Sequence, residues 1–216
     1  MKIKSFFYIA FSILISFNSL AQNKERKFKI HTLAFYNLEN LFDTINDVNK
    51  NDEASPIMEI KFNRGNIYKQ KVTNMARVIS EIGYDVTNRP PTIIGICEVE
   101  NRNVVEDLIA NEKLSKYNYG IVHYDSPDRR GIDVGLLYNK DIFKVINSNS
   151  HVLYINYNNT SDRSFTRDQL VVSGKLDGEL IHLIVNHWPS RGADETKRMA
   201  AAAVNNNIID SLRKIH

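Results

Sequence analysis

Four polar side chains stand at the ends of predicted strands, and their types suit chemistry on a phosphate ester. They are Asn37, Glu98, Asp133 and His187. Strand ends that feed surface loops are where α/β proteins place their sites. Taken together, the four residues predict one site built from an amide, two carboxylates and an imidazole.

A hard divalent cation beside a phosphate is the chemistry that these residue types favour. Mg²⁺ prefers oxygen ligands, retains several waters and is often held by one or two carboxylates plus the substrate phosphate. Glu98 is the predicted metal ligand, and Asn37 is predicted to orient that ligand or a metal-bound water. Asp133 is predicted to fix the tautomer of His187, which contacts the phosphoryl oxygens as charge develops. Zinc is disfavoured because the chain has one cysteine and its histidines lack ligand spacing.

Each of these residues also has a purely structural interpretation. A glutamate after a buried strand is often only the first solvated residue, an asparagine can bond its own turn, and a histidine can be satisfied inside a core. Cys97 lies in an apolar run and is interpreted as a buried apolar residue rather than a nucleophile. The acids of segment 43–66 are interpreted as part of a polar surface loop rather than a calcium site.

Three helices are predicted among the elements that must position the site. Apolar residues recur at helical spacing over 68–82. Asn103 with Glu106 resembles a capping box, which predicts a helix over 104–111. A longer helix is predicted from about Asp194, through a run of alanines, to the end of the chain.

Strands dominate the second half of the sequence. They are predicted at 29–37, 92–97, 119–124, 134–138, 144–154, 169–176 and 180–186. Asp177-Gly178 predicts a tight hairpin between the last two. Helices among such strands predict a layered α/β domain with at least partly antiparallel sheets. Because a helix after an apolar strand normally leads back into the sheet, the topology predicts a further strand beyond His216.

The first 21 residues have a different composition from the rest. Two lysines precede the apolar run 6–17, and small residues ending at Ala21 provide a cleavage site. This pattern is typical of a secretory signal peptide, and the apolar run is short for a membrane anchor. We therefore predict a mature chain of residues 22–216 that is periplasmic or secreted. Export without an internal disulfide fits a bacterial source.

The net charge gives no sign of a polyanion-binding surface over the whole molecule. The chain has 28 Lys and Arg against 25 Asp and Glu, a net charge of +3. Removal of the signal peptide takes away two lysines and leaves about +1. Nucleic-acid binding would therefore depend on a local basic patch.

Four segments, in order along the chain, resemble motifs of the endonuclease/exonuclease/phosphatase superfamily. They are FYNLENLF at 35–42, ICEVEN at 96–101, RGIDVGLLY at 130–138 and NHWPSR at 186–191. The superfamily includes pancreatic-type deoxyribonuclease, exonuclease III-like repair enzymes, bacterial sphingomyelinases and inositol-phosphate phosphatases. The resemblance runs from about residue 29 to the end and is strongest to exported bacterial endonucleases.

The resemblance implies a four-layer sandwich, in which two mainly antiparallel sheets pack between helices. It also implies in-line attack of water on a phosphodiester, assisted by Mg²⁺ or alternatively Mn²⁺. Glu98 matches the metal-binding glutamate, Asn37 the asparagine of the first motif and His187 the first catalytic histidine. Asp133 matches the acidic partner of that histidine, within a residue or two.

Two arginines are implied as contacts to the substrate phosphate. Arg167 resembles an arginine that contacts phosphate in the deoxyribonucleases, and its structural alternative is a strand-edge pair with Asp168. Arg191 follows His187 on the same predicted loop and is the weaker candidate, since a loop arginine is usually solvated.

Two later superfamily motifs, Gly-Asp-Phe/Leu-Asn and Ser-Asp-His, do not occur in this sequence. Residues 22–216 are therefore expected to form the N-terminal two-thirds of the domain. The 216-residue chain alone is expected to be inactive, although the complete gene product is expected to be an enzyme. A nuclease acting on DNA or RNA is the predicted function. The alternatives are a phosphatase or phospholipid phosphodiesterase of the same superfamily, or a phosphate-binding module without activity.

Overall fold

The computed structural model describes residues 28–156 and 160–215. The predicted signal peptide, residues 1–21, lies outside the described residues. The described strands and helices all belong to one compact unit, His31–His216. In the part of the chain that the structure describes, no helix is both long enough and apolar enough to span a bilayer.

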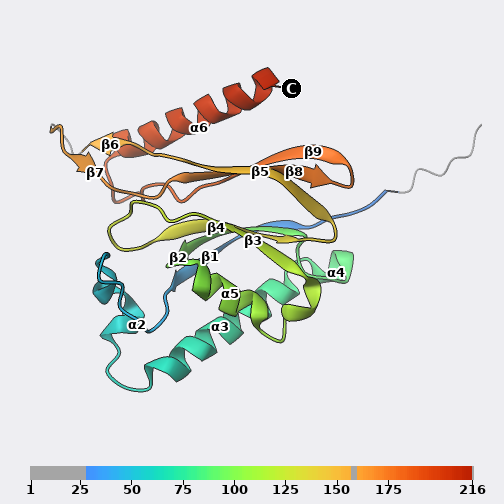
Figure 1. Cartoon of the computed structure of the whole chain (residues 1–216), viewed down its shortest axis with the longest axis horizontal. Helices are drawn as coiled ribbons and strands as arrows, with labels where there is room; N and C mark the ends of the chain where they lie inside the picture. The colour runs from blue at the N-terminus through green and yellow to red at the C-terminus, as the bar shows by residue number, and fades with distance from the viewer. Residues whose placement is uncertain (1–27, 157–159, 216) are drawn as a thin grey trace, which may run out of the picture. The chain divides into compact units, whose positions relative to one another are not determined.

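One sheet of four strands carries most of the candidate residues. Its order is β1 (Leu33–Leu41), β2 (Ile93–Val99), β4 (Asp133–Asn139) and β3 (Tyr119–His123). The strands β1 and β2 are parallel, and the other two pairs are antiparallel. Figure 1 shows helices α3 (Arg64–Glu81) and α5 (Arg102–Ala110) against one face of this sheet.

Strand β2 is a continuous apolar run because both of its faces are covered. Ile94 and Ile96 belong to the core beneath the helices. Ile93 and Cys97 belong to the core between the two sheets. This alternation is what a strand buried on both sides requires. Burial raises the pKa of the Cys97 thiol to about 12, which agrees with the predicted structural role.

A second sheet packs against the first through that shared core. It contains β5 (Phe143–His151), β8 (Gln169–Leu176) and β9 (Glu179–Val185), all antiparallel. The predicted hairpin at Asp177 and Gly178 is confirmed, and both residues have positive φ values of 50° and 92°. A two-residue turn of this kind needs both central residues in that region.

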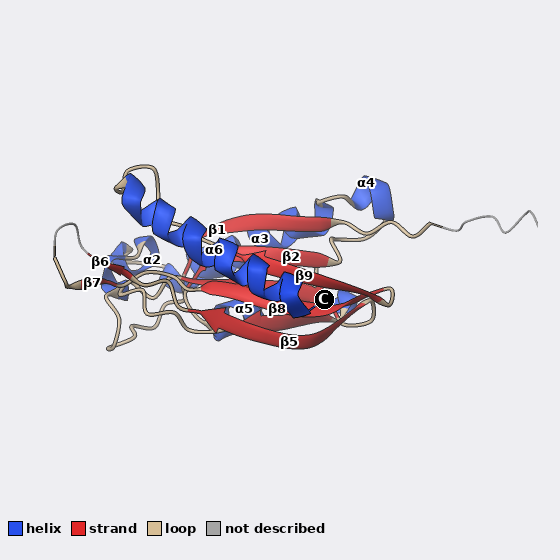
Figure 2. Ribbon diagram, turned by 90° about the horizontal axis from the view of Figure 1, so that it is seen from above, coloured by secondary structure: helices blue, strands red, loops and turns tan. Residues whose placement is uncertain are grey.

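Helix α6 (Glu195–Ile215) covers the outer face of the second sheet (Figures 1 and 2). Ala201 and Ile208 are its most buried residues. The side chain of Gln169 on β8 donates from Nε2 to the carbonyl oxygen of Ala201 at 2.8 Å. This buried hydrogen bond fixes the position of α6 along β8.

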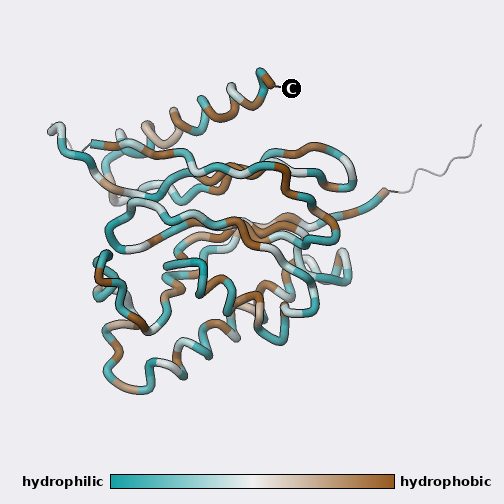
Figure 3. The backbone as a smooth tube through the Cα atoms, viewed as in Figure 1, coloured by the Kyte–Doolittle hydropathy of each residue, from teal (hydrophilic) through white to brown (hydrophobic). Residues whose placement is uncertain are grey.

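The His31–His216 unit therefore has four layers, with two sheets between helices. The predicted fold class, a layered α/β sandwich of two mainly antiparallel sheets flanked by helices, is confirmed. Figure 3 shows the hydrophobic stretches along the central strands, where the two sheets face each other. Shorter elements are the helices η1 (Asp52–Ala54), α2 (Pro56–Glu59), α4 (Tyr84–Thr87) and η2 (Ser115–Tyr117), and the ribbon of β6 (Ile155–Asn156) and β7 (Arg163–Ser164).

Two local predictions were wrong. The second helix is capped by Asn101, whose Oδ1 accepts from the backbone N–H of Val104 at 3.1 Å, and not by Asn103. Segment 43–66 is not a solvated loop throughout, because Ile57 packs with Phe42 and Ile132 in a small core. The polar composition of that segment concealed one apolar turn.

Gly174 provides a test of the packing between β5 and β8. A Cβ at this position would overlap the ring of Phe143 and would lie 2.7 Å from the carbonyl oxygen of Lys144. We expect Gly174→Ala to lower the free energy of unfolding by about 2 kcal/mol, the scale of overpacking a core. Urea denaturation measures the change.

The control for this substitution is Gly65→Ala, because nothing lies within 4 Å of a Cβ at Gly65. It should be neutral or slightly stabilising, since alanine favours a helix. In a Phe143→Leu background the cost of Gly174→Ala should fall by about 1 kcal/mol. Equal costs in both backgrounds would contradict the assigned contact.

Candidate active site

Glu98 is held in an unusual backbone conformation by a bulge in β2. The pairing of β2 with β4 shifts register between Cys97 and Val99, and Glu98 has a φ of 59°. A non-glycine residue in that region costs about 1–3 kcal/mol and persists only where its surroundings impose it. Bulges often redirect a side chain beside an active site. Here the bulge turns the Glu98 carboxylate toward a pocket at the strand end.

Two donors from the neighbouring strand fix that carboxylate. Asn37 donates from Nδ2 to Oε1 at 3.0 Å, and the backbone N–H of Asn40 donates to Oε2 at 3.1 Å. The Asn37 Oδ1 atom accepts from the N–H of Glu39 at 2.7 Å. Asn37 therefore orients Glu98, and its own oxygen is already engaged. Lys71 holds the turn from the other side by donating to the carbonyl oxygens of Glu39 and Asn40.

His187 lies opposite, at the end of β9. Its Nε2 is 3.3 Å from Glu98 Oε1, and its buried Nδ1 has no hydrogen-bond partner among the described residues. Burial lowers the pKa of His187, the positive charge of Arg167 lowers it further, and Glu98 opposes both. The imidazole is therefore neutral at pH 7, since its ordinary pKa is already about 6.5. A neutral imidazole has one N–H and one acceptor nitrogen, so Nε2, which faces the carboxylate, carries the proton and Nδ1 is the acceptor.

Asp128 holds two arginines at the far side of the pocket. Arg130 makes a bidentate pair with it, at 3.1 Å from Nε and 3.0 Å from Nη2, and Arg167 donates from Nη1 at 3.1 Å. Burial alone would raise the pKa of Asp128, but these two cations hold it below its usual value. The carboxylate is thus ionised, and it partly neutralises both guanidinium groups.

Arg167 also ties the site together through the backbone. Its Nε donates to the carbonyl oxygen of His187 at 3.0 Å, and its Nη2 donates to that of Trp188 at 3.1 Å. The proposed strand-edge pair with Asp168 does not form, because Asp168 accepts from Ser150 and from the backbone of Leu153. Arg167 is buried and anchors the loop that presents His187.

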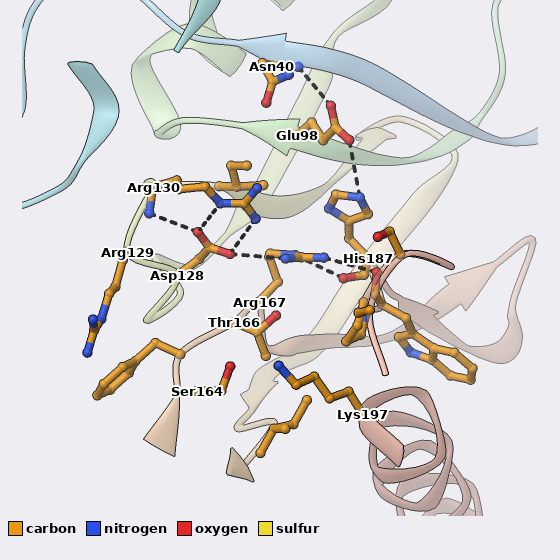
Figure 4. Close-up of a pocket in the computed structure, with 17 residues that line it drawn as sticks. Asn40, Glu98, Asp128, Arg129, Arg130, Ser164, Thr166, Arg167, His187 and Lys197 are labelled. Carbon is orange, nitrogen blue, oxygen red and sulfur yellow. Dashed lines mark hydrogen bonds and ion pairs between the residues drawn. The ribbon is translucent and has the colours of Figure 1, made fainter. Parts of the chain in front are cut away.

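Together these residues surround an open pocket of about 530 Å³ (Figure 4). Among the described residues that line it, the cations Arg129, Arg130, Arg167 and Lys197 face the carboxylates Glu98 and Asp128. The excess of positive charge suits an anionic ligand. Arg191 is exposed and is not among the lining residues, so the structure does not place the second predicted phosphate contact at the pocket.

The predicted pairing of Asp133 with His187 is wrong. Asp133 is buried, its Oδ1 accepts from the N–H of Ser126 at 2.8 Å, and its Oδ2 lies 3.0 Å from Nε2 of His123. The bulge sets Asp133 opposite Val99, so its side chain meets β3 and not the pocket. Both of its oxygens are used there, and the orientation of His187 comes from elsewhere.

His123, Asp125 and Asp133 form a cluster whose potential ligand atoms lie within 4.8 Å of one another. The two ring nitrogens of His123 face different carboxylates: Nε2 faces Asp133 at 3.0 Å, and Nδ1 faces Asp125 at 4.0 Å. A histidine bridging two carboxylates accounts for this arrangement. The cluster lies outside the lining of the pocket.

Sequence reasoning missed Asp128 and Lys197 as members of the site. Asp128 stands two residues before Arg130, which opens one of the four motifs. That proximity of opposite charges was a usable signal. Lys197 carries no comparable signal, because a lysine in the first turn of a helix is an ordinary surface residue.

The sequence model of the Endonuclease/Exonuclease/phosphatase family matches residues 32–216. The chain therefore belongs to the Endonuclease/Exonuclease/phosphatase family, whose members are hydrolases of phosphodiester bonds. No curated protein matches the sequence significantly.

Solved structures share the fold at low sequence identity. A functionally unknown conserved protein from Enterococcus faecalis V583 is 16% identical with a TM-score of 0.52, and the match covers 84% of this chain and 60% of that one. ANGEL2, a 2',3'-cyclic phosphatase, is 14% identical with a TM-score of 0.50, over 84% of this chain and 47% of its own. The endonuclease/exonuclease/phosphatase from Bacteroides vulgatus is 18% identical with a TM-score of 0.49, over 82% and 59%. The chain thus spans between 47% and 60% of the length of these structures.

Glu100, two residues beyond Glu98, predicts a pH effect on stability. It is buried, and burial together with the charges of Asp43, Asp52 and Asp47 raises its pKa from 4.5 to about 7, despite a hydrogen bond from the N–H of Asp43. The folded protein therefore holds a proton there that the unfolded chain has lost, so stability falls as pH rises from about 4.5 through 7. Glu100→Gln should raise the free energy of unfolding at pH 8 by roughly 1–2 kcal/mol.

That gain should shrink toward zero below pH 4.5, where Glu100 is protonated in both states. Urea denaturation at pH 8 and pH 4 measures the difference. Glu106→Gln is the control, because Glu106 is exposed and pairs with Arg102 on the surface of α5. An equal gain at both pH values would contradict the assignment.

Proposed function

We propose that this protein is a metal-dependent phosphodiester hydrolase that acts on nucleic acid and is exported from the cell. The observation that carries the proposal is the carboxylate of Glu98, which a strained bulge and two donors hold at the mouth of a cationic pocket. Residues 1–21 support export, and a mature N-terminus far from Gln22 would argue against it.

The residues around Glu98 fit a magnesium or manganese ion. One carboxylate with an orienting amide is what Mg²⁺ commonly receives from protein, the remaining positions being water and phosphate. When bound there, such an ion would lower the pKa of a water and polarise the phosphoryl group. Asn37 contributes by fixing the carboxylate, as outer partners of metal ligands do.

The other residues of the pocket suit binding of the phosphate itself. Arg130 retains donors beyond its pair with Asp128 and is exposed to the pocket. Nε2 of His187, 3.3 Å from Glu98 Oε1, is the ring nitrogen placed to donate a hydrogen bond to a phosphoryl oxygen, since Nδ1 is buried. Preorganised donors of this kind stabilise the charge that builds up during in-line displacement.

Glu98→Gln tests the proposal directly. The substitution keeps the shape of the side chain and removes the charge that binds the cation. We expect loss of Mn²⁺ binding, followed by electron paramagnetic resonance, and a fall in Mg²⁺-dependent cleavage of on the order of 10²-fold or more in the complete gene product. Glu100→Gln is the matched control, since Glu100 lies outside the pocket lining.

Wild-type cleavage by Glu98→Gln would remove Glu98 from the site. If the protein leaves plasmid DNA and RNA intact but cleaves another phosphodiester, the proposed activity on nucleic acid is refuted.

His187→Ala should lower turnover by about 100-fold, the scale of losing one preorganised donor. His182→Ala is the control, because His182 lies on β9, the strand that leads to His187, and bonds to Ser173 outside the pocket lining. Steady-state kinetics separates the two outcomes. A rise in KM with unchanged kcat would mean that His187 only binds substrate.

A further inference from the structure

Four side chains beside the pocket form a continuous stack of alternating aromatic rings and guanidinium groups. Arg163 lies 5.0 Å from the ring centroid of Tyr154 and 4.9 Å from that of Phe165, and Arg129 lies 5.1 Å from the Phe165 ring. We call Tyr154, Arg163, Phe165 and Arg129 the aromatic–arginine stack.

The stack is built on the ribbon of β6 and β7. Asn156 pairs with Arg163 in this ribbon, and Tyr154 directly precedes β6. Arg163 and Phe165 are two residues apart, so they project from the same side of the chain. Arg129 reaches the stack from the loop that carries Asp128 (Figure 4).

Exposure distinguishes this stack from an ordinary core contact. Tyr154 is 59% exposed and Phe165 is 37% exposed. The Nε of Arg163 is buried without a hydrogen-bond partner among the described residues, and its guanidinium lies over both rings. In this order Phe165 lies between Arg163 and Arg129, so the faces left for a ligand are those at the two ends of the stack, on the Tyr154 ring and on the Arg129 guanidinium.

The stack is continuous with the pocket. Arg129, Ser164 and Phe165 line the pocket together with Glu98 and His187. A nucleic acid whose phosphodiester lies in the pocket beside those two residues would therefore have a neighbouring nucleotide within the same pocket as Arg129 and Phe165. Aromatic rings and arginines that alternate beside a cationic groove are the arrangement that single-stranded nucleic acids bind, since every base has a face to stack.

We propose that the aromatic–arginine stack binds unpaired nucleobases and makes the enzyme prefer single-stranded nucleic acid. The proposal rests on the proposed function, because it assumes that the pocket holds a phosphodiester. Bases inside a duplex stack on one another and cannot also lie on Tyr154 or on the Arg129 guanidinium that Phe165 supports. The stack therefore selects for strand state rather than sequence.

The test compares oligonucleotides that differ in their bases, in their sugar or in their strand state. Fluorescence anisotropy, with EDTA present to prevent cleavage, gives the Kd of the complete protein for a thymidine oligonucleotide, a uridine oligonucleotide, an abasic oligonucleotide of equal length and a blunt duplex. Phe165→Leu removes the ring and keeps apolar bulk, and Phe165→Trp restores a ring. Tyr84→Ala on α4 is the control, because Tyr84 is exposed to a similar degree, 44%, and lies outside the pocket lining.

We expect Phe165→Leu to weaken thymidine and uridine oligonucleotides by roughly tenfold and the abasic strand by less than twofold, the scale of one stacked base. Phe165→Trp should retain the affinity, and the duplex should bind more weakly than the thymidine strand. Equal loss on thymidine and abasic strands, or no loss on either, would overturn the stacking role. If Phe165→Leu lowers the melting temperature, the same binding measurements are made with Tyr154→Ala, because Tyr154 is the more exposed ring. Unchanged binding of the thymidine strand by Tyr154→Ala would then overturn the stacking role.

The outcomes also separate this proposal from the proposed function. Stacking is refuted, and the hydrolase kept, if Phe165→Leu binds thymidine strands normally while cleavage still depends on Glu98. The reverse result, base-dependent binding without Glu98-dependent cleavage, would keep the stack and refute the hydrolase.

Discussion

The candidate active site depends on one residue that adopts a backbone conformation few side chains tolerate. Glu98 has a φ of 59°, and the bulge that imposes it disturbs the pairing of β2 with both neighbours. Glu39 and Asn40 on β1 also have positive φ, so two adjacent strands share the distortion. The core on both faces of β2 supplies the stability that such strain requires.

Charge balance is the second requirement of the pocket. Two guanidinium groups beside one another would repel, and a buried arginine without a partner would be costly. Asp128 meets both needs with a single carboxylate, which contacts Arg130 and Arg167. Arg130 remains exposed enough to meet a ligand, whereas Arg167 is buried. Arg130 and Arg167 therefore have different tasks, although one carboxylate holds both.

The sequence predicted the large elements well because their signals are local. The apolar run of β2, the helical spacing of α3 and the Asp177-Gly178 turn each specify one structure within a few residues. The predicted partner of Asp133 was wrong because a one-residue bulge in β2 decides where Asp133 points. The amino-acid composition of β2 does not reveal this bulge. The β6–β7 ribbon was missed because its strands have two residues each. Features set by long-range register are beyond a single sequence.

The contact of Arg167 with main-chain oxygens has a consequence for how the protein can vary. Its guanidinium donates hydrogen bonds to the carbonyl oxygens of His187 and Trp188, and not to their side chains. Arg198 on α6 similarly donates to the carbonyls of Ser190 and Ala193. The loop between β9 and α6 is thus fastened at both ends by its backbone. These bonds do not depend on which side chains the loop carries, although Trp188 also packs against Leu153 and Ile155. An insertion or deletion would displace the carbonyl groups and release His187.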